Sequence, residues 1–142
     1  MTDSWADEKA IIDVTIAYTW ALDTRSFDDL RQVFAPDAVG DLGGRHCEGI
    51  DAIIARIQEP LSKLDVTQHV VTNHQVRVDG DTAGCRCYLV GQHVKKGTEG
   101  GDTFIMAGVY EDELARTADG WRIVHRTLTI HWTDGNPAVV GR

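Results

Sequence analysis

Residues 67–94, TQHVVTNHQVRVDGDTAGCRCYLVGQHV, decide the fold of this chain. Both halves of the stretch have the valine-rich and threonine-rich composition of β-strands, and Asp79-Gly80-Asp81 between them is typical of a hairpin turn. Two further strand-like runs follow, separated by residues 95–101 and by Ala118-Asp119-Gly120. The pattern predicts four antiparallel strands from Thr67 onward.

The first half of the chain has the apolar spacing of helices. The pattern predicts one helix from about Trp5 to Leu22 and a third over about 51–64, which Pro60 should kink or shorten. Between them, Ser26 and Asp29 resemble a capping box, which predicts a second short helix that ends before Pro36.

Helices grouped before strands are typical of the α+β class, with the helices packed on one face of a strongly curved sheet. With 142 residues, of which 42% are hydrophobic, the chain fits one domain, 1–142, with a single core. We expect its tail, 134–142, to be mobile unless it covers a pocket or a neighbouring subunit.

Composition excludes several classes of partner. A formal net charge of -8 opposes binding to nucleic acid or to an anionic membrane. The sequence has no apolar run long enough to span a bilayer and no signal peptide at its start, so we expect a cytoplasmic protein. Cys47, Cys85 and Cys87 are interpreted as reduced thiols, and the acidic runs Asp28-Asp29 and 111–113 as solvated surface.

Four polar residues interrupt segments that otherwise have core patterning: Tyr18, Asp23, His69 and Arg126. Arg126 lies in an apolar stripe of the last strand, where it needs an anionic partner unless it reaches water at the sheet margin, and Asp23 is our candidate. Asp23 can turn back toward Tyr18 only if the first helix ends nearby. His69 opens its strand, and His74 should face the other way unless a bulge intervenes.

Each of these residues has an ordinary structural alternative. Asp23 alone could cap a turn, Tyr18 could be a core residue with a satisfied hydroxyl, and His69 could simply be solvated. As a set, they supply the carboxylate, imidazole, phenol and guanidinium of acid–base chemistry. The six histidines lack metal-ligand spacing, and no phosphate or dinucleotide loop is present, so we expect neither a metal nor a cofactor.

Five segments give the chain a resemblance to a known family. They are 18–23 (YTWALD), 30–37 (LRQVFAPD), 69–73 (HVVTN), 78–83 (VDGDTA) and 120–126 (GWRIVHR). Nearly the whole chain resembles the SnoaL-like branch of the cystatin-like α+β cone superfamily, which includes ketosteroid isomerase and scytalone dehydratase. The resemblance implies a cone-shaped sheet covered by about three helices.

Within that superfamily the chain is most similar to the dehydratases and dehydrochlorinases that use an Asp–His pair. The resemblance implies that Asp23 and His69 form this pair, with Arg126 and Tyr18 beside it, and it more weakly relates His93 to a second histidine of scytalone dehydratase. A substrate pocket around the four is expected to include, with weaker support, Trp20, His93, Val124, Leu128 and Trp132.

These features favour a cofactor-independent lyase that eliminates water from a hydrophobic cyclic small molecule. Two alternatives stay open: an isomerase or polyketide cyclase using the same base, and a non-catalytic module comparable to the small subunit of ring-hydroxylating dioxygenases. We also expect a homo-oligomer, a trimer rather than a dimer, because Phe104, Tyr110, Trp121 and Ile123 offer more apolar area than one pocket needs.

Overall fold

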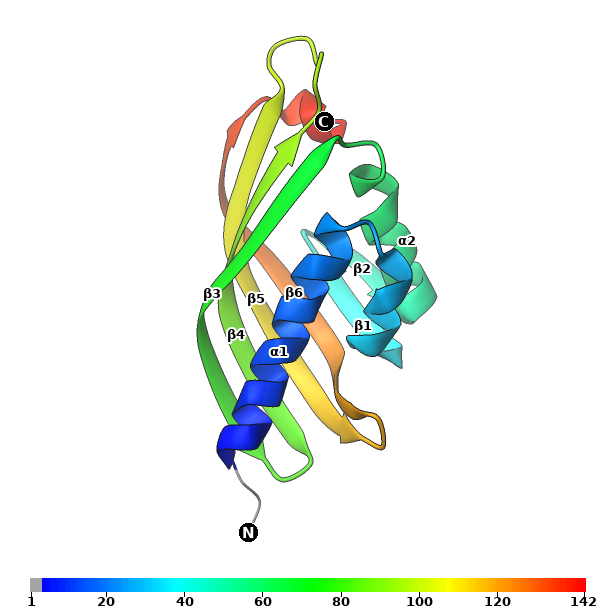
Figure 1. Cartoon of the computed structure of the whole chain (residues 1–142), viewed down its shortest axis with the longest axis vertical. Coiled ribbons are helices and arrows are strands. Elements are labelled where there is room, and N and C mark those ends of the chain that lie inside the picture. The colour runs from blue at the N-terminus through cyan, green and yellow to red at the C-terminus, as the bar shows by residue number, and fades with distance from the viewer. Residues whose placement is uncertain (1–3) are drawn as a thin grey trace.

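The computed structural model describes residues 4–142, which form a curved sheet with its helices on one face (Figure 1). The helices are α1 (Ser4–Asp23), the 3-10 helix η1 (Phe27–Gln32), α2 (Ile50–Leu61) and the short 3-10 helix η2 (Pro137–Val140). The strands are β1 (Phe34–Leu42), β2 (Arg45–Glu48), β3 (Val66–Asp79), β4 (Thr82–Val94), β5 (Thr103–Thr117) and β6 (Gly120–Gly135). This is the α+β cone fold that the sequence predicts.

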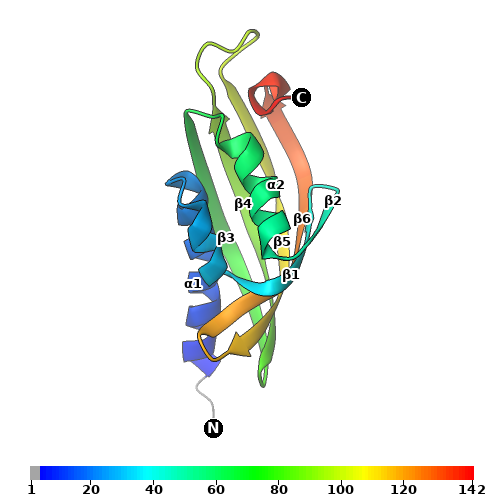
Figure 2. The same ribbon diagram turned by 90° about the vertical axis from the view of Figure 1, so that its right-hand side faces the viewer.

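The sheet has the strand order β2-β1-β6-β5-β4-β3. Strands β3 to β6 form the expected antiparallel meander, whereas β1 pairs with β6 in parallel. Sequence patterning missed β1 and β2, and Pro36, expected only to stop a helix, lies inside β1. Seen from the side in Figure 2, α1 and α2 lie on the same side of the curved sheet.

Two details of the helices differ from the sequence prediction. The side chain of Ser26 makes no capping hydrogen bond to η1, so the expected capping box is absent. Pro60 lies in the last turn of α2, which ends at Leu61, three residues earlier than the pattern suggested. Pro60 has no amide hydrogen to donate to the carbonyl of Arg56, so α2 loses one hydrogen bond there, and the helix ends at the next residue.

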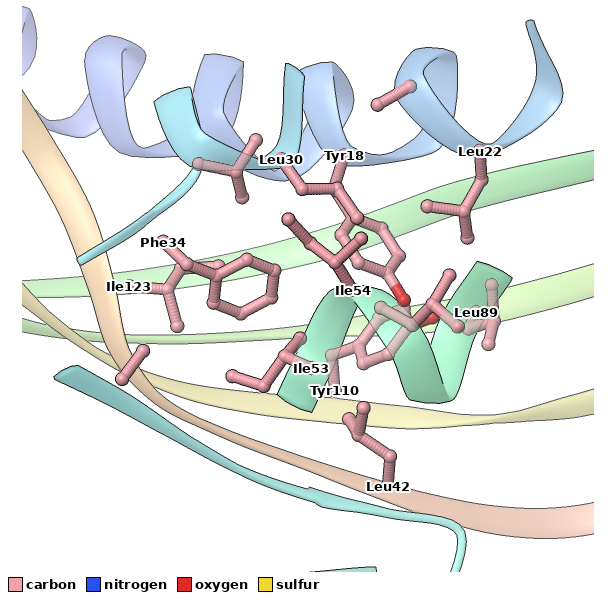
Figure 3. Close-up of a cluster of buried hydrophobic side chains, with 14 of the residues drawn as sticks. Tyr18, Leu22, Leu30, Phe34, Leu42, Ile53, Ile54, Leu89, Tyr110 and Ile123 are labelled. Carbon is pink, nitrogen blue, oxygen red and sulfur yellow. The ribbon is translucent and has the colours of Figure 1, made fainter. Parts of the chain in front are cut away.

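The core fills the space between the helices and the sheet. Figure 3 shows side chains of α1, η1 and α2 meeting those of the strands, with Tyr18 and Tyr110 near the centre of the cluster. Phe104, Trp121 and Ile123, which we expected to leave apolar surface for a subunit contact, are also buried within the chain. That reason for expecting an oligomer is therefore wrong, and the trimer stays a prediction without it.

Bulges change which residues of β6 face the helices. The register between β5 and β6 shifts between Glu113 and Leu114 and again between Ala107 and Gly108. Each shift inserts one extra residue into β6, which reverses the alternation of side chains beyond it. The single alternating stripe predicted for this strand is consequently broken at both ends, at Val124 and before Trp132.

Candidate functional site

Asp23 reaches the sheet because α1 ends at this residue. The amide of Ser26 donates to the carbonyl of Ala21 and that of Arg25 to Leu22, the two hydrogen bonds of a Schellman motif. The motif needs a residue with positive φ, and Arg25 takes this place with φ of 61°. The helix end that the sequence prediction required is therefore present.

A hydrogen-bonded pair of Asp23 and His69 lies at the junction of α1 and β3. His69 Nδ1 is 2.7 Å from Asp23 Oδ1, and the His69 amide donates to Asp23 Oδ2 over 2.8 Å. Thr67 also donates to this carboxylate, and Arg25 donates to Thr67, so three residues hold the acid in place. Because Nδ1 faces a carboxylate, it carries the proton in the neutral ring, which leaves Nε2 free as a base.

The carboxyl of Asp23 is held in its charged form. Burial alone would raise its pKa, but the hydrogen bonds from His69 and Thr67 outweigh burial and hold the pKa below its usual value. An ionised carboxylate beside Nδ1 stabilises the imidazolium that forms when Nε2 takes a proton.

A second histidine, His93, lies beside this pair. Its ring meets that of His69 edge to face at 5.7 Å between centroids, and its Nδ1 donates to the carbonyl of Phe104 over 3.0 Å. Burial, together with the nearby His69, lowers the pKa of His93, so the ring stays neutral at working pH. Gly91 makes room for both rings, since a Cβ there would lie 3.3 Å from His69 Cδ2 and 3.4 Å from His93 Cε1.

Arg126 does not bind Asp23, contrary to the prediction from sequence. It forms a bidentate pair with Asp112, in which Nε and Nη2 each lie 2.8 Å from a carboxylate oxygen. Both side chains are 0% exposed. The prediction that 111–113 is a solvated run is wrong for Asp112, because alternation along β5 turns it toward the core, directly across from Arg126 in the register.

The guanidinium of Arg126 lies against two tyrosine rings. Its carbon is 4.3 Å from the ring centroid of Tyr18 and 3.8 Å from that of Tyr110. Figure 3 shows the two phenol oxygens pointing toward one another. Burial raises the pKa of both phenols, so both keep their protons and can act as hydrogen-bond donors.

Tyr18 and His69 face one cavity of about 420 Å³, a size that suits a small organic ligand. The apolar part of its wall includes Leu22, Leu42, Leu61, Leu89, Met106 and Leu128. Asp23 and Arg126 do not line it, and each contacts a residue that does. His93 and Leu128 line the cavity, as the sequence predicted for them.

Three other predicted pocket residues lie elsewhere. Trp20 is 65% exposed on the outer side of α1, and Trp132 is 52% exposed beyond the second bulge of β6. Val124 is the residue inserted at the first bulge, and it does not line the cavity either. The two bulges in β6 move Val124 and Trp132 off the pocket face, and sequence alone could not locate these bulges.

The C-terminal tail covers one side of the cavity. Asn136 Oδ1 accepts a hydrogen bond from the Ala138 amide, and Asn136 Nδ2 donates to the carbonyls of Glu99 and Gly101. These bonds anchor η2 to the loop between β4 and β5. Val139 is 2% exposed and lines the cavity. Residues 138–142 of the tail thus line the cavity, which is one of the two placements in which we expected the tail not to be mobile.

His74 occupies a separate place beneath α1. The register of β3 shifts between Thr72 and Gln75, and Asn73 has φ of 60°, so a bulge returns His74 to the helix-facing side. There its Nε2 lies 2.8 Å from the hydroxyl of Thr15, outside the cavity.

Sequence reasoning missed Asp112 and Tyr110 as polar neighbours of the site. Both lie at inward positions of β5, two residues apart, and this period of two was the available signal.

Within residues 4–142, no cluster of three or more His, Cys, Asp or Glu side chains could hold a metal ion. Over the same residues, no helix combines the length and apolar character of a membrane span.

The fold and the cavity define a class, the cystatin-like α+β cones with a pocket between helices and sheet. Residues 3–127 match the model of the SnoaL-like domain, so the chain belongs to the SnoaL-like family.

Two relatives cover most of the chain. The uncharacterised protein Rv2910c of Mycobacterium tuberculosis is 38% identical over 129 residues, covering 87% of this chain and 85% of the relative. The terrestric acid biosynthesis cluster protein E of Penicillium crustosum is 34% identical over 148 residues, covering 100% of this chain and 94% of its own. A solved structure of hexachlorocyclohexane dehydrochlorinase (LinA) type 2 superposes with a TM-score of 0.83 at 19% identity, covering 94% of this chain and 90% of that one, which shows a shared fold.

Proposed function

We propose that this protein is a cofactor-independent lyase that removes water from a hydrophobic cyclic small molecule. The observation that carries the proposal is the Asp23–His69 pair, because His69 lines a cavity that also has a large apolar wall, and its Nε2 is not used by the pair. A histidine backed by an ionised carboxylate is the usual arrangement of a general base. Maintaining such a pair and two buried phenols in a core costs stability, which favours a functional reason for them.

The reaction needs only the groups present. His69 Nε2 takes a proton from the carbon next to a substrate carbonyl, and the electron pair of that C–H bond forms the new double bond as the neighbouring C–O bond breaks. The imidazolium then returns the proton to the departing hydroxyl, which leaves as water. Asp23 orients the ring and stabilises its cation throughout.

The two tyrosines supply the electrophilic side of the site. An O–H of Tyr18 or Tyr110 can donate to the substrate carbonyl, where negative charge accumulates as the proton leaves. Arg126 acts from behind the rings, because its positive charge lies within 4.3 Å of the ring centroids and makes the phenols better donors. Its role is thus to position and polarise the tyrosines rather than to contact substrate.

The comparisons favour small-molecule chemistry of this kind. LinA, which shares the fold, is a dehydrochlorinase by name, and the Penicillium relative is named for a biosynthesis cluster. An isomerase or cyclase would use the same base and oxygen-binding groups, so the product of the reaction distinguishes these alternatives from elimination. A non-catalytic module would bind ligand without changing it.

The test compares His69→Ala with His131→Ala on a panel of cyclic β-hydroxy ketones. His131 is an exposed histidine of β6 that does not line the cavity, which makes it a matched control. Elimination produces a conjugated enone, so turnover is followed by its ultraviolet absorbance and by loss of water in the mass spectrum. We expect His69→Ala to lose about 100-fold to 10,000-fold in rate and His131→Ala to lose nothing.

Asp23→Asn provides a second measurement, because it keeps the shape of the side chain but removes its charge. We expect a fall in turnover with little change in substrate affinity, since the amide cannot stabilise the imidazolium. A folded His69→Ala protein with full activity would refute the scheme. A panel that binds but never reacts would favour the non-catalytic module.

A further inference from the structure

Charged side chains are unevenly distributed around the cavity. Five basic residues line it against a single acidic residue, Glu59; the five are Arg45, Arg56, Lys63, Lys95 and Arg142. The chain as a whole has the opposite balance, with 22 acidic and 14 basic residues. A concentration of cations at the cavity of an acidic protein therefore needs its own explanation.

None of these five basic side chains forms an ion pair among the described residues, 4–142. Among residues 4–142, the ion pairs involve other side chains, and none includes any of the five or Glu59. Arg31, Arg116 and Arg126, by contrast, each bind a carboxylate. The basic residues of the cavity thus keep their charges available for a ligand.

Arg56 gives a second, independent indication. It projects from the middle of α2, between the buried Ile53 and Ile57, and its Nε is buried without a hydrogen-bond partner. A buried donor without an acceptor costs about 1–3 kcal/mol, so a ligand oxygen at this point would relieve the cost. Lys63 lies two residues beyond the end of α2 and lines the same cavity.

We infer that the substrate of the proposed elimination is amphiphilic, with its ring against the apolar wall of the cavity and an anionic group at the basic mouth. By the basic mouth we mean the five basic lining residues Arg45, Arg56, Lys63, Lys95 and Arg142. Arg56 would bind the anion from the cavity wall, while Lys63 and Lys95 would attract it from the exposed rim. Guanidinium and ammonium groups both suit carboxylate and phosphate, so the anion is a carboxylic acid or a phosphate ester. The inference rests on the proposed function for the reacting ring of the substrate, whereas the anionic group is inferred from the basic residues alone.

The test uses three ligands of one shape: 2-naphthoate, its neutral amide 2-naphthamide, and 2-naphthyl phosphate, each titrated by calorimetry. We expect the naphthoate or the phosphate to bind about tenfold more tightly than the amide, and the difference to shrink as salt rises. Tighter binding of the carboxylate would assign a carboxylic acid, and tighter binding of the phosphate a phosphate ester. Equal affinity of all three ligands at low salt would overturn the inference.

Substitutions test which basic residues bind the anionic group of the ligand. Arg56→Gln, and separately the double change Lys63→Gln with Lys95→Gln, should each remove about tenfold of anion affinity while leaving the amide unaffected. Retained amide binding reports that a variant is folded. Lys96→Gln is the matched control, because Lys96 adjoins Lys95 but does not line the cavity. A loss in the control as large as in the double variant would refute a specific site.

The outcome is separable from that of the proposed function. The His69→Ala variant should keep its preference for the anionic ligands, because His69 is not part of the basic mouth. A preference for anions without any elimination would remove the lyase and leave this inference standing. Elimination of neutral substrates without a preference for anions would support the lyase and refute this inference.

Discussion

Asp112→Asn tests the interpretation of the buried ion pair. The substitution keeps the volume of the side chain but removes the negative charge that neutralises Arg126. Both side chains are 0% exposed, and two hydrogen bonds of 2.8 Å join them. The variant leaves a positive charge in a site where water cannot reach it.

The expected cost follows from that geometry. Breaking a buried pair by removing one partner costs about 3–5 kcal/mol, and the amide oxygen of asparagine can still accept one of the two hydrogen bonds. We therefore expect a loss near the lower limit, about 3 kcal/mol of unfolding free energy. A domain with a stability of about 5–15 kcal/mol still folds after such a loss.

Urea unfolding followed by tryptophan fluorescence measures the effect. With a slope of about 1.5 kcal/mol per molar urea, the midpoint should fall by about 2 M. Glu113→Gln, the next residue along β5 and exposed, should change the free energy by less than about 0.5 kcal/mol.

The double replacement Asp112→Leu with Arg126→Met completes the comparison. Because it removes both charges, it should recover most of the stability lost in the single variant. A loss below about 1 kcal/mol for Asp112→Asn, or a double variant no better than the single one, would refute the reasoning.

Three other predictions test individual features of the protein. Gly91→Ala places a methyl group 3.3 Å from His69 Cδ2, so turnover should fall about tenfold as the ring shifts, and unchanged kinetics would contradict that contact. Burial raises the pKa of Cys85 to about 12 and that of Cys87 to about 11, so iodoacetamide at about pH 8 should label neither until urea is added, as read by peptide mass spectrometry. The lowered pKa of Asp23 contributes stability that is present above its unfolded value of about 3.9 and is lost on acidification below it, so melting temperatures should fall less in Asp23→Asn than in wild type between about pH 5 and pH 3.

Local patterning was sufficient for much of the site. The end of the first helix and the start of the strand near Thr67 follow from short-range signals, whereas the pairing of Asp23 with His69, 46 positions apart, was expected only from the family resemblance. The partner of Arg126 was not predictable in the same way. Asp112 stands between two glutamates in the sequence, and only its register opposite Arg126 distinguishes a core carboxylate from two exposed ones.

The sequence by itself determined the α+β class and the antiparallel meander, because helix and strand periodicities depend on neighbours only a few positions away. Tertiary structure alone decided which side chains enter the cavity. Single-residue bulges in β6 moved Val124 and Trp132 off the pocket face, and the folded tail brought Val139 onto it. These outcomes depend on pairing between distant strands, where one inserted residue reverses every side chain beyond it.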